Sequence, residues 1–256
     1  MDLLRIGCYD RTPIKGILMS RILKATVGIR TQTRMFRIRG LGGTIVDAVL
    51  QRRGHASLPE DAFAQVGFIA DEQGIRLGVP DHGPQLTVTH SDITYQEDCY
   101  TEGLFDFARF HQRFRELWKT VNEILKVTHV RRIGFVTEER LENPNPSEAL
   151  LESLTKWPSQ SPVAGFNLRF VERVSESPSF NEEESAYVNR IYSLYDGLLD
   201  KEHPDQGQVN AMLDIQRYFA PLISGNMADE LLKLHNKDYL PAHKELKARL
   251  ATLGLK

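Results

Sequence analysis

Three consecutive stretches decide the fold of this chain: residues 86–96 read LTVTHSDITYQ, residues 105–124 form an aromatic-rich segment, and residues 129–141 read HVRRIGFVTEERL. The first stretch alternates polar and apolar residues, which is typical of a strand with one buried face. In the second, apolar residues recur at steps of three and four, which places them on one helix face. They are Phe107, Phe110, Phe114, Leu117, Val121 and Ile124. The order strand, helix, strand predicts a helix laid over a sheet.

The first part of the chain predicts further strands around one helix. Alternation between Ile17 and Arg39 indicates one or two strands, and Gly40, Gly42 and Gly43 interrupt it. Thr44 is expected to cap a helix over residues 44–53. Strand-like runs at 63–70 and 75–81 flank the turn DEQG at 71–74, so they predict a hairpin.

The second part has a similar outline. A short helix is expected at Glu148–Leu154, then strand-like runs at 163–174, 185–199 and 209–219, of which the middle one also fits helical spacing. Helices over Met227–His235 and Ala242–Leu250 end the chain. Strands that follow one another through short turns favour antiparallel pairing. We therefore expect an α+β protein with mainly antiparallel sheets and helices packed on one side, and the outline also allows two similar halves. Residues 1–256 are expected to form one globular unit, with a possible sub-boundary near 142–147.

Composition restricts the class of protein. The chain is 41% hydrophobic and 26% charged, which is ordinary for a globular protein, and it has only two cysteines, Cys8 and Cys99. There is no apolar run long enough to cross a membrane and no secretory leader, so we expect a cytoplasmic protein without membrane contact. The histidines and cysteines lack zinc-ligand spacing, so no metal and no cofactor are expected.

Charge is unevenly distributed along the chain. Residues 1–53 hold 11 Lys and Arg against three Asp and Glu, although the whole chain has a net charge of −2. Such an asymmetry is consistent with an anionic partner for the basic N-terminal part. It is also consistent with basic side chains balanced by acids elsewhere in the fold, or with a homo-oligomer in which basic and acidic faces meet.

Two groups of residues are candidates for chemistry. The first is an anion site made by Arg37, Arg39, Gly42, Gly43, Thr44, Arg52 and Arg53, because a helix start offers unpaired N–H groups. A turn-and-cap role explains the same residues. The second comprises Asp205, Asp214 and Gln216, which have the outline of a metal-dependent nuclease core, with Gln216 in the place usually taken by a lysine. The simpler interpretation gives Asp205 to a turn and Asp214 to a polar strand face.

Short motifs also carry a family resemblance. Arg132-Ile133-Gly134 follows the aromatic helix, and Leu234-His235-Asn236 lies near the C-terminus. In this order the chain resembles an uncharacterised, sporadically distributed family of bacterial and archaeal proteins. Phe135 to Glu138 depart from the aromatic-Asn continuation of that family. The resemblance implies a fold and no activity.

Three functions remain open at this stage. The first is a non-enzymatic binding or interaction protein, for example a partner component of a mobile bacterial module, which would have a protein partner or form a homo-oligomer. The second is a metal-dependent nuclease or another enzyme that acts on phosphate-containing substrates. The third is a nucleic-acid-binding module that uses the basic N-terminal part.

Overall fold

The computed structural model describes most of the chain. The described residues are 21–54, 58, 62–63, 69–71, 74–79, 82–99, 105–142, 167–175, 179–196 and 208–252. The predicted helix at Glu148–Leu154, the possible boundary near 142–147 beyond its first residue, and Asp205 lie outside these ranges.

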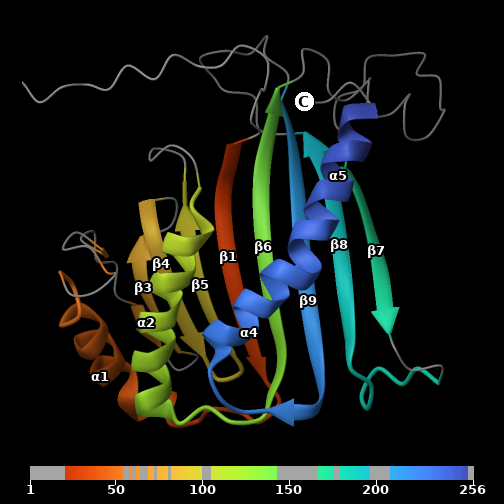
Figure 1. Ribbon diagram of the computed structural model, residues 1–256. Coiled ribbons are helices and arrows are strands. Elements are labelled where there is room, and N and C mark those ends of the chain that lie inside the picture. The colour runs from red at the N-terminus through yellow and green to blue at the C-terminus, as the bar shows by residue number, and fades with distance from the viewer. Residues whose placement is uncertain are drawn as a thin grey trace, which may run out of the picture.

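All described strands belong to one antiparallel sheet, which confirms the predicted class. It has nine strands in the order β2-β3-β4-β5-β1-β6-β9-β8-β7 (Figure 1). The strands are β1 (Arg21–Thr31), β2 (Ile69–Asp71), β3 (Gly74–Val79), β4 (His82–Thr89), β5 (Asp92–Asp98), β6 (Val130–Glu142), β7 (Asn167–Ser175), β8 (Tyr187–Asp196) and β9 (Gln208–Ile223).

The described helices all lie against one face of this sheet, as Figure 1 shows. They are α1 (Ile38–Leu50), α2 (Phe107–Leu125), α4 (Met227–Leu234), the π-helix η1 (His235–Tyr239) and α5 (Leu240–Thr252). Because side chains alternate between the faces of a strand, every second residue of β1 from Leu23 to Thr31 is buried under the helices. We call the opposite side of the sheet the far face.

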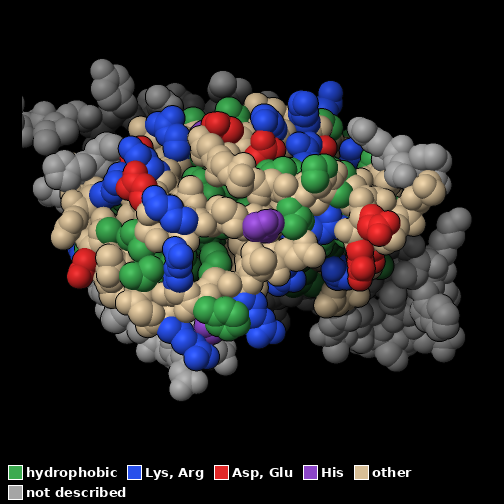
Figure 2. Space-filling view, turned by 90° about the horizontal axis from the view of Figure 1, so that it is seen from below, with side chains coloured by type: hydrophobic (Ala, Val, Ile, Leu, Met, Phe, Trp, Pro, Cys, Tyr) green, Lys and Arg blue, Asp and Glu red, His purple; other side chains and the backbone are tan. Residues whose placement is uncertain are grey.

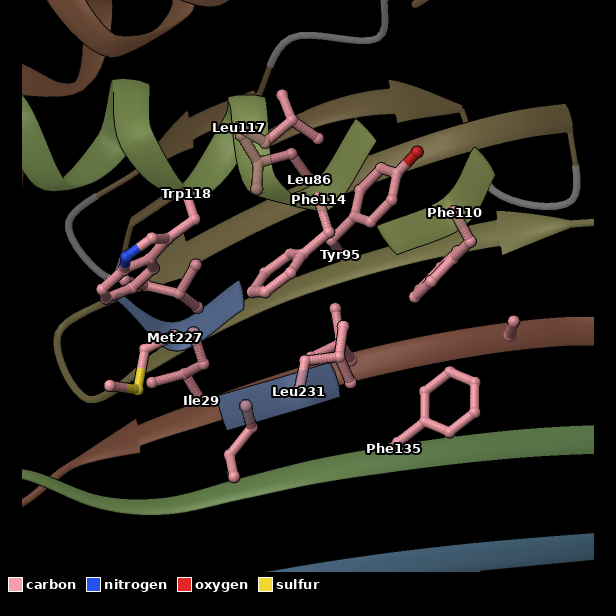
Figure 3. Close-up of a cluster of buried hydrophobic side chains, with 14 of the residues drawn as sticks. Ile29, Leu86, Tyr95, Phe110, Phe114, Leu117, Trp118, Phe135, Met227 and Leu231 are labelled. Atoms are coloured by element: carbon pink, nitrogen blue, oxygen red, sulfur yellow. The ribbon is translucent and has the colours of Figure 1, made fainter. Parts of the chain in front are cut away.

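Helix α2 fits the sequence prediction closely. Its apolar stripe is buried at Phe110, Phe114, Leu117 and Val121, whereas Phe107 is half-buried. Asp106 caps the first turn, since its Oδ1 accepts hydrogen bonds from the backbone N–H groups of Ala108 and Arg109 at 2.9 and 3.3 Å. The stripe packs on strand residues such as Ile29, Tyr95 and Phe135, with Leu231 of α4 beside it (Figure 3).

The two parts of the chain share one pattern of strand pairing. Each begins with a central strand, β1 or β6, and the last strand of each part, β5 or β9, pairs with it and is followed by a helix, α2 or α4. Strands β1 and β6 pair with each other at the centre of the sheet, where Gly28 lies opposite Gly134. The order of pairing outward from the centre is therefore the same in both parts, with five strands in the first and four described strands in the second.

Helix α1 begins earlier than the sequence predicted. It runs from Ile38, so the expected strand end MFRIRG is a loop followed by a helix, and Gly40–Thr44 are helical rather than a turn with a cap. Tight packing explains one of the glycines: a Cβ atom on Gly42 would lie only 2.7 Å from the Cγ2 atom of Ile75. Here close packing against β3 outweighs the low helix propensity of glycine.

The C-terminal helices also differ from the prediction. The gap expected between residues 235 and 242 is bridged by η1, so α4, η1 and α5 follow without a break. Pro241, which has no N–H to donate, is the second residue of α5. The ambiguous run at 185–199 contains strand β8.

Candidate functional site

The predicted anion site is not assembled as the sequence suggested. Gly42, Gly43 and Thr44 lie within α1, so their N–H groups are not the free donors of a helix start. At the real start, the N–H groups of Ile38 and Arg39 donate to the carbonyl groups of Met35 and Phe36. Arg37 and Arg39 are exposed beside this start.

The arginines of the basic N-terminal part differ in whether they are paired with acids. Arg52, at the C-terminal end of α1, forms ion pairs with Glu116 and Glu123 of α2 at 3.5 and 3.3 Å. Arg30 is held by Asp92 on the neighbouring strand, with 2.8 Å between Nε and Oδ1. Within the described part of the chain, Arg34, Arg37 and Arg39 have no ion pair, whereas Arg52 is tied to acids.

The two described residues of the predicted nuclease core lie together on the far face. Gln216 donates from Nε2 to the Asp214 carboxylate at 2.6 Å, and its Oε1 accepts from Tyr218 at 3.0 Å and from Arg132 at 3.4 Å. Burial raises the pKa of the Asp214 carboxyl, although Gln216, Arg132 and Arg169 oppose that effect. Among the described residues, no group of three His, Cys, Asp or Glu side chains is placed to hold a metal ion.

A second set of charged side chains gathers at one end of the sheet. Strands β1, β7 and β9 end here, and β6 and β8 begin here; we call it the lower end. In Figure 2, which views this end, Lys and Arg side chains gather toward the left and a group of acidic side chains stands at the right. The acidic group at the right therefore lies apart from the main group of cations, although single acidic side chains also lie among those cations and some cations lie beside the acidic group.

The basic side of the lower end contains a hollow of about 390 Å³. We call it the basic hollow; its lining residues are Thr33, Arg34, Met35, Phe36, Arg37, Leu125, Lys126, Val127 and Thr128. The ring of Phe36 is 61% exposed and touches only the His90 ring among the described aromatic side chains, with ring centroids 5.7 Å apart. An exposed aromatic ring beside exposed cations is typical of a binding surface.

The backbone of the basic hollow is held in an uncommon conformation. Lys126 has a φ angle of 53° and the nearby His129 one of 57°, both in the left-handed region. The conformation of Lys126 is fixed by two hydrogen bonds of 2.9 Å. The N–H of Lys126 donates to the carbonyl of Asn122, and the N–H of Val127 donates to the Asn122 side chain. Lys126 is the C-cap of α2, and a left-handed residue commonly ends a helix in this way.

The acidic side is the segment 179–186, which we call the acidic loop. Glu182, Glu183 and Glu184 are exposed, as is Phe180. The guanidinium group of Arg131 donates to the carbonyl groups of Glu182 and Phe219, which ties the loop to the start of β6 and the end of β9. Within the loop, the N–H of Ser185 donates to the carbonyl of Asn181 at 2.8 Å. These bonds connect the loop to the neighbouring strand ends.

The sequence pattern did not single out Arg131, Phe36 or Phe180. One signal was present: Phe36 stands between Arg34 and Arg37, and Phe180 stands two residues before the run Glu182–Glu184. Each aromatic residue therefore has neighbours of one charge sign. The register that brings both segments to the same end of the sheet could not be deduced from these residues.

Another polar cluster lies between the helices and the sheet. The Glu139 carboxylate on β6 accepts from His243 and from Lys247 of α5, the latter at 2.8 Å. Thr137 and Tyr239 share a hydrogen bond of 2.8 Å beside it. Burial favours the neutral acid, but the hydrogen bond and charge of His243, followed by Lys247, outweigh it and lower the pKa of Glu139 to about 2.

The π-helix aligns rings next to this cluster. His235 stacks on Phe107 with ring centroids 3.4 Å apart, and the Tyr239 ring lies between those of His235 and His243 at 5.3 and 5.4 Å. Burial lowers the pKa of His235, although its bond with Asn236 opposes that effect. The rings of His235 and Tyr239 are packed on Phe135 and fill the core, so we assign them to helix docking.

Comparison with known proteins assigns no function to this site. Neither the protein-family models nor the curated proteins include a match to the chain. The family resemblance carried by Arg132–Gly134 and Leu234–Asn236 therefore stays a prediction. In the described ranges no helix has both the length and the apolar character that crossing a membrane requires.

Proposed function

We propose that the chain is a non-enzymatic interaction protein that binds a protein partner through its lower end. The observation that carries this proposal is the separation of charge there, with an exposed phenylalanine on each side: Phe36 beside the basic hollow and Phe180 in the acidic loop. Aromatic and arginine side chains supply most of the binding energy in protein interfaces.

The hydrogen bonds that hold both segments support the proposal. The acidic loop is held by Arg131, and the basic hollow by the hydrogen bonds of Asn122. A surface that is ordered before binding loses less conformational entropy when the partner docks. Exposed and preorganised charges also select the partner, because a partner with like charges at the same places is repelled.

A nucleic-acid-binding module is the second candidate. Arg34, Arg37 and Arg39 are exposed without a described ion pair, and they lie on one side of the lower end. The acidic loop at the same end disfavours a polyanion. If a duplex bound through about three phosphate contacts, log K would fall with log salt at a slope of roughly −2.7. Fluorescence anisotropy with a random-sequence duplex measures this slope.

A photo-crosslinking experiment tests the proposed function in cells. A benzophenone amino acid replaces Phe36 in one variant and Leu240, which is 46% exposed on α5, in a matched control. We expect a protein adduct from position 36 that disappears when Arg34→Glu and Arg37→Glu are added, and no adduct from position 240. The proposal is wrong if position 36 gives no protein adduct or crosslinks to nucleic acid.

A further inference from the structure

We infer that the partner bound at the lower end is a second copy of this chain, arranged so that the acidic loop of each copy enters the basic hollow of the other. This inference rests on the proposed function and names the partner of that same surface. It is carried by the charge and the shape of two segments that both lie at one end of one chain.

The two segments are complementary in charge. The basic hollow presents Arg34, Arg37 and Lys126, for which no ion pair is made within the described residues. In the acidic loop, Glu183 and Glu184 are exposed and likewise unpaired there, while Glu182 is shared with Arg173 at 3.5 Å. Because the two segments lie on opposite sides of the end, these cations and carboxylates can pair with each other only between copies.

The two segments are also complementary in shape. The basic hollow is a concavity of about 390 Å³, and the acidic loop exposes the side chains of Glu182, Glu183 and Glu184 just before β8. A glutamate side chain that enters the hollow meets the Phe36 ring and the Lys126 ammonium group on its walls. Phe180 accompanies the carboxylates and supplies apolar contact area.

The position of both segments determines the symmetry. Because the hollow and the loop lie on opposite sides of the same end, a two-fold axis perpendicular both to the strands and to the line from hollow to loop brings both pairs together at once. Such an arrangement closes, so it gives a dimer and not an open chain of subunits. Each dimer then contains two equivalent contacts, and each contact joins a basic hollow to an acidic loop.

The lower end is close in size to a standard interface. A standard protein interface uses about 20–30 residues from each partner. The exposed residues of this end come from four segments, 32–37, 126–129, 179–186 and 221–226, and together they approach that number.

A complementary charge reversal tests the inference on the full chain. Variant A carries Arg34→Glu, Arg37→Glu and Lys126→Glu, and variant B carries Glu182→Arg, Glu183→Lys and Glu184→Lys. We expect the unchanged protein to sediment as a dimer at low salt and to dissociate at about 0.5 M salt, where exposed charges are screened. Each variant alone should be monomeric, with a dimer dissociation constant raised at least about 100-fold.

Mixing the two variants gives the decisive measurement. In an A–B pair the reversed hollow of A faces the reversed loop of B, and the unchanged loop of A faces the unchanged hollow of B, so the equimolar mixture should again form a dimer. Circular dichroism of each variant alone checks that it is folded. Lys244→Glu and Asp47→Lys, which change two exposed charges away from the lower end, serve as controls that remain dimeric.

Each outcome decides something different. A monomeric unchanged protein at low salt, an open polymer, or folded variants whose mixture stays monomeric would overturn the inference of a reciprocal dimer. If the protein is monomeric but position 36 still crosslinks to another protein in cells, the proposed function stands and only the identity of the partner is wrong. If both experiments are negative, both proposals fail.

Discussion

The two halves of the sheet have the same strand pairing but differ in how completely their polar side chains are hydrogen-bonded. On the far face of the first half, polar groups bond to one another: Asp98 accepts from Gln85 and from Gln96, each at 3.4 Å, and Asp92 accepts from Arg30. On the far face of the second half, five buried side-chain atoms have no hydrogen-bond partner among the described residues. They are Arg132 Nε, Arg140 Nε, Ser193 Oγ, Asn210 Oδ1 and Asp214 Oδ1. A shared topology therefore does not fix how completely polar groups are paired.

The helix-facing side shows a related contrast. Each half anchors a helix to the sheet through one buried glutamate. In the first half Glu97 pairs with Arg113 of α2 at 3.3 Å. In the second half Glu139 pairs with His243 and Lys247 of α5. The second half therefore depends on a histidine-containing cluster to hold its helix. Its far face also has more polar atoms without a hydrogen-bond partner within the described structure.

The largest expected effect tests whether the halves fold together. Phe114→Ala removes a ring that is 1% exposed in the first half, so it should cost about 3–5 kcal/mol through lost burial and a cavity. Because β1 and β6 join the halves, urea unfolding should remain one transition that moves to lower denaturant. Hydrogen exchange in β8 measures this directly: unchanged protection there would mean that the second half is stable without the first.

The same helix shows how much the sequence could predict. The stripe of α2 repeats over about five turns, so tertiary contacts and local pattern agree, and the predicted bounds lie within two residues of the observed ones. The predicted start of α1 is wrong because glycine usually interrupts helices, while here Gly42 is required by contact with Ile75 on β3. Such a contact depends on strand register, which a single sequence does not display.

The second expected effect concerns pH and the second half alone. The folded-state pKa of Glu139 is lowered from 4.5 to about 2, so the unfolded chain takes up this proton first as pH falls. The stabilisation is complete above about pH 4.5, is lost as pH falls toward 2, and amounts to about 3 kcal/mol. Urea unfolding from pH 6 to pH 2.5 measures it.

Glu139→Gln is the matched variant for that pH series. It should remove this part of the loss of stability at low pH, because the amide that replaces the carboxylate has no proton to gain. If the variant and the unchanged protein lose stability equally between pH 4.5 and 2.5, Glu139 is not the group responsible, and the contrast between the helix anchors fails.

A smaller effect of opposite sign should appear on the far face. Ser193 is 5% exposed and its Oγ has no partner among the described residues, so Ser193→Ala should stabilise the protein by about 1 kcal/mol through removal of an unpaired polar group. Thr26→Val is the first-half control. Its hydroxyl donates to Gln96 at 3.4 Å, and its loss should cost up to about 1 kcal/mol. Equal effects in thermal unfolding would remove the difference between the faces.

The smallest effect is expected at Gly28 of β1, where the two halves meet. A Cβ atom on Gly28 meets nothing within 4 Å, so Gly28→Ala should stabilise by roughly 0.5–1 kcal/mol, since glycine loses more backbone freedom on folding. Gly42→Ala should destabilise, because its Cβ would approach Ile75 to 2.7 Å. Thermal unfolding of both variants measures the two changes in stability. A loss of stability in Gly28→Ala would show that β1 and β6 pack too closely at this point to accept a Cβ atom.

The candidate interaction surface was less predictable than the fold. The basic excess of residues 1–53 and the run Glu182–Glu184 are visible in the sequence, and a homo-oligomer that joins basic and acidic faces was one of the open explanations. The sequence could not show that Arg52 and Arg30 form ion pairs, while Arg34 and Arg37 make none with the described residues. Which arginines form ion pairs depends on which strands and helices become neighbours.

The pairing of β1 with β6 has a consequence for synthesis on the ribosome. Until residues 130–142 emerge, β1 has β5 on one side and an unpaired edge of 11 residues on the other. A long unpaired edge is a template for pairing with another nascent chain. A ribosome that stops before the second half is translated therefore releases an aggregation-prone fragment, and the central strand of the finished protein is the most vulnerable strand of the unfinished one.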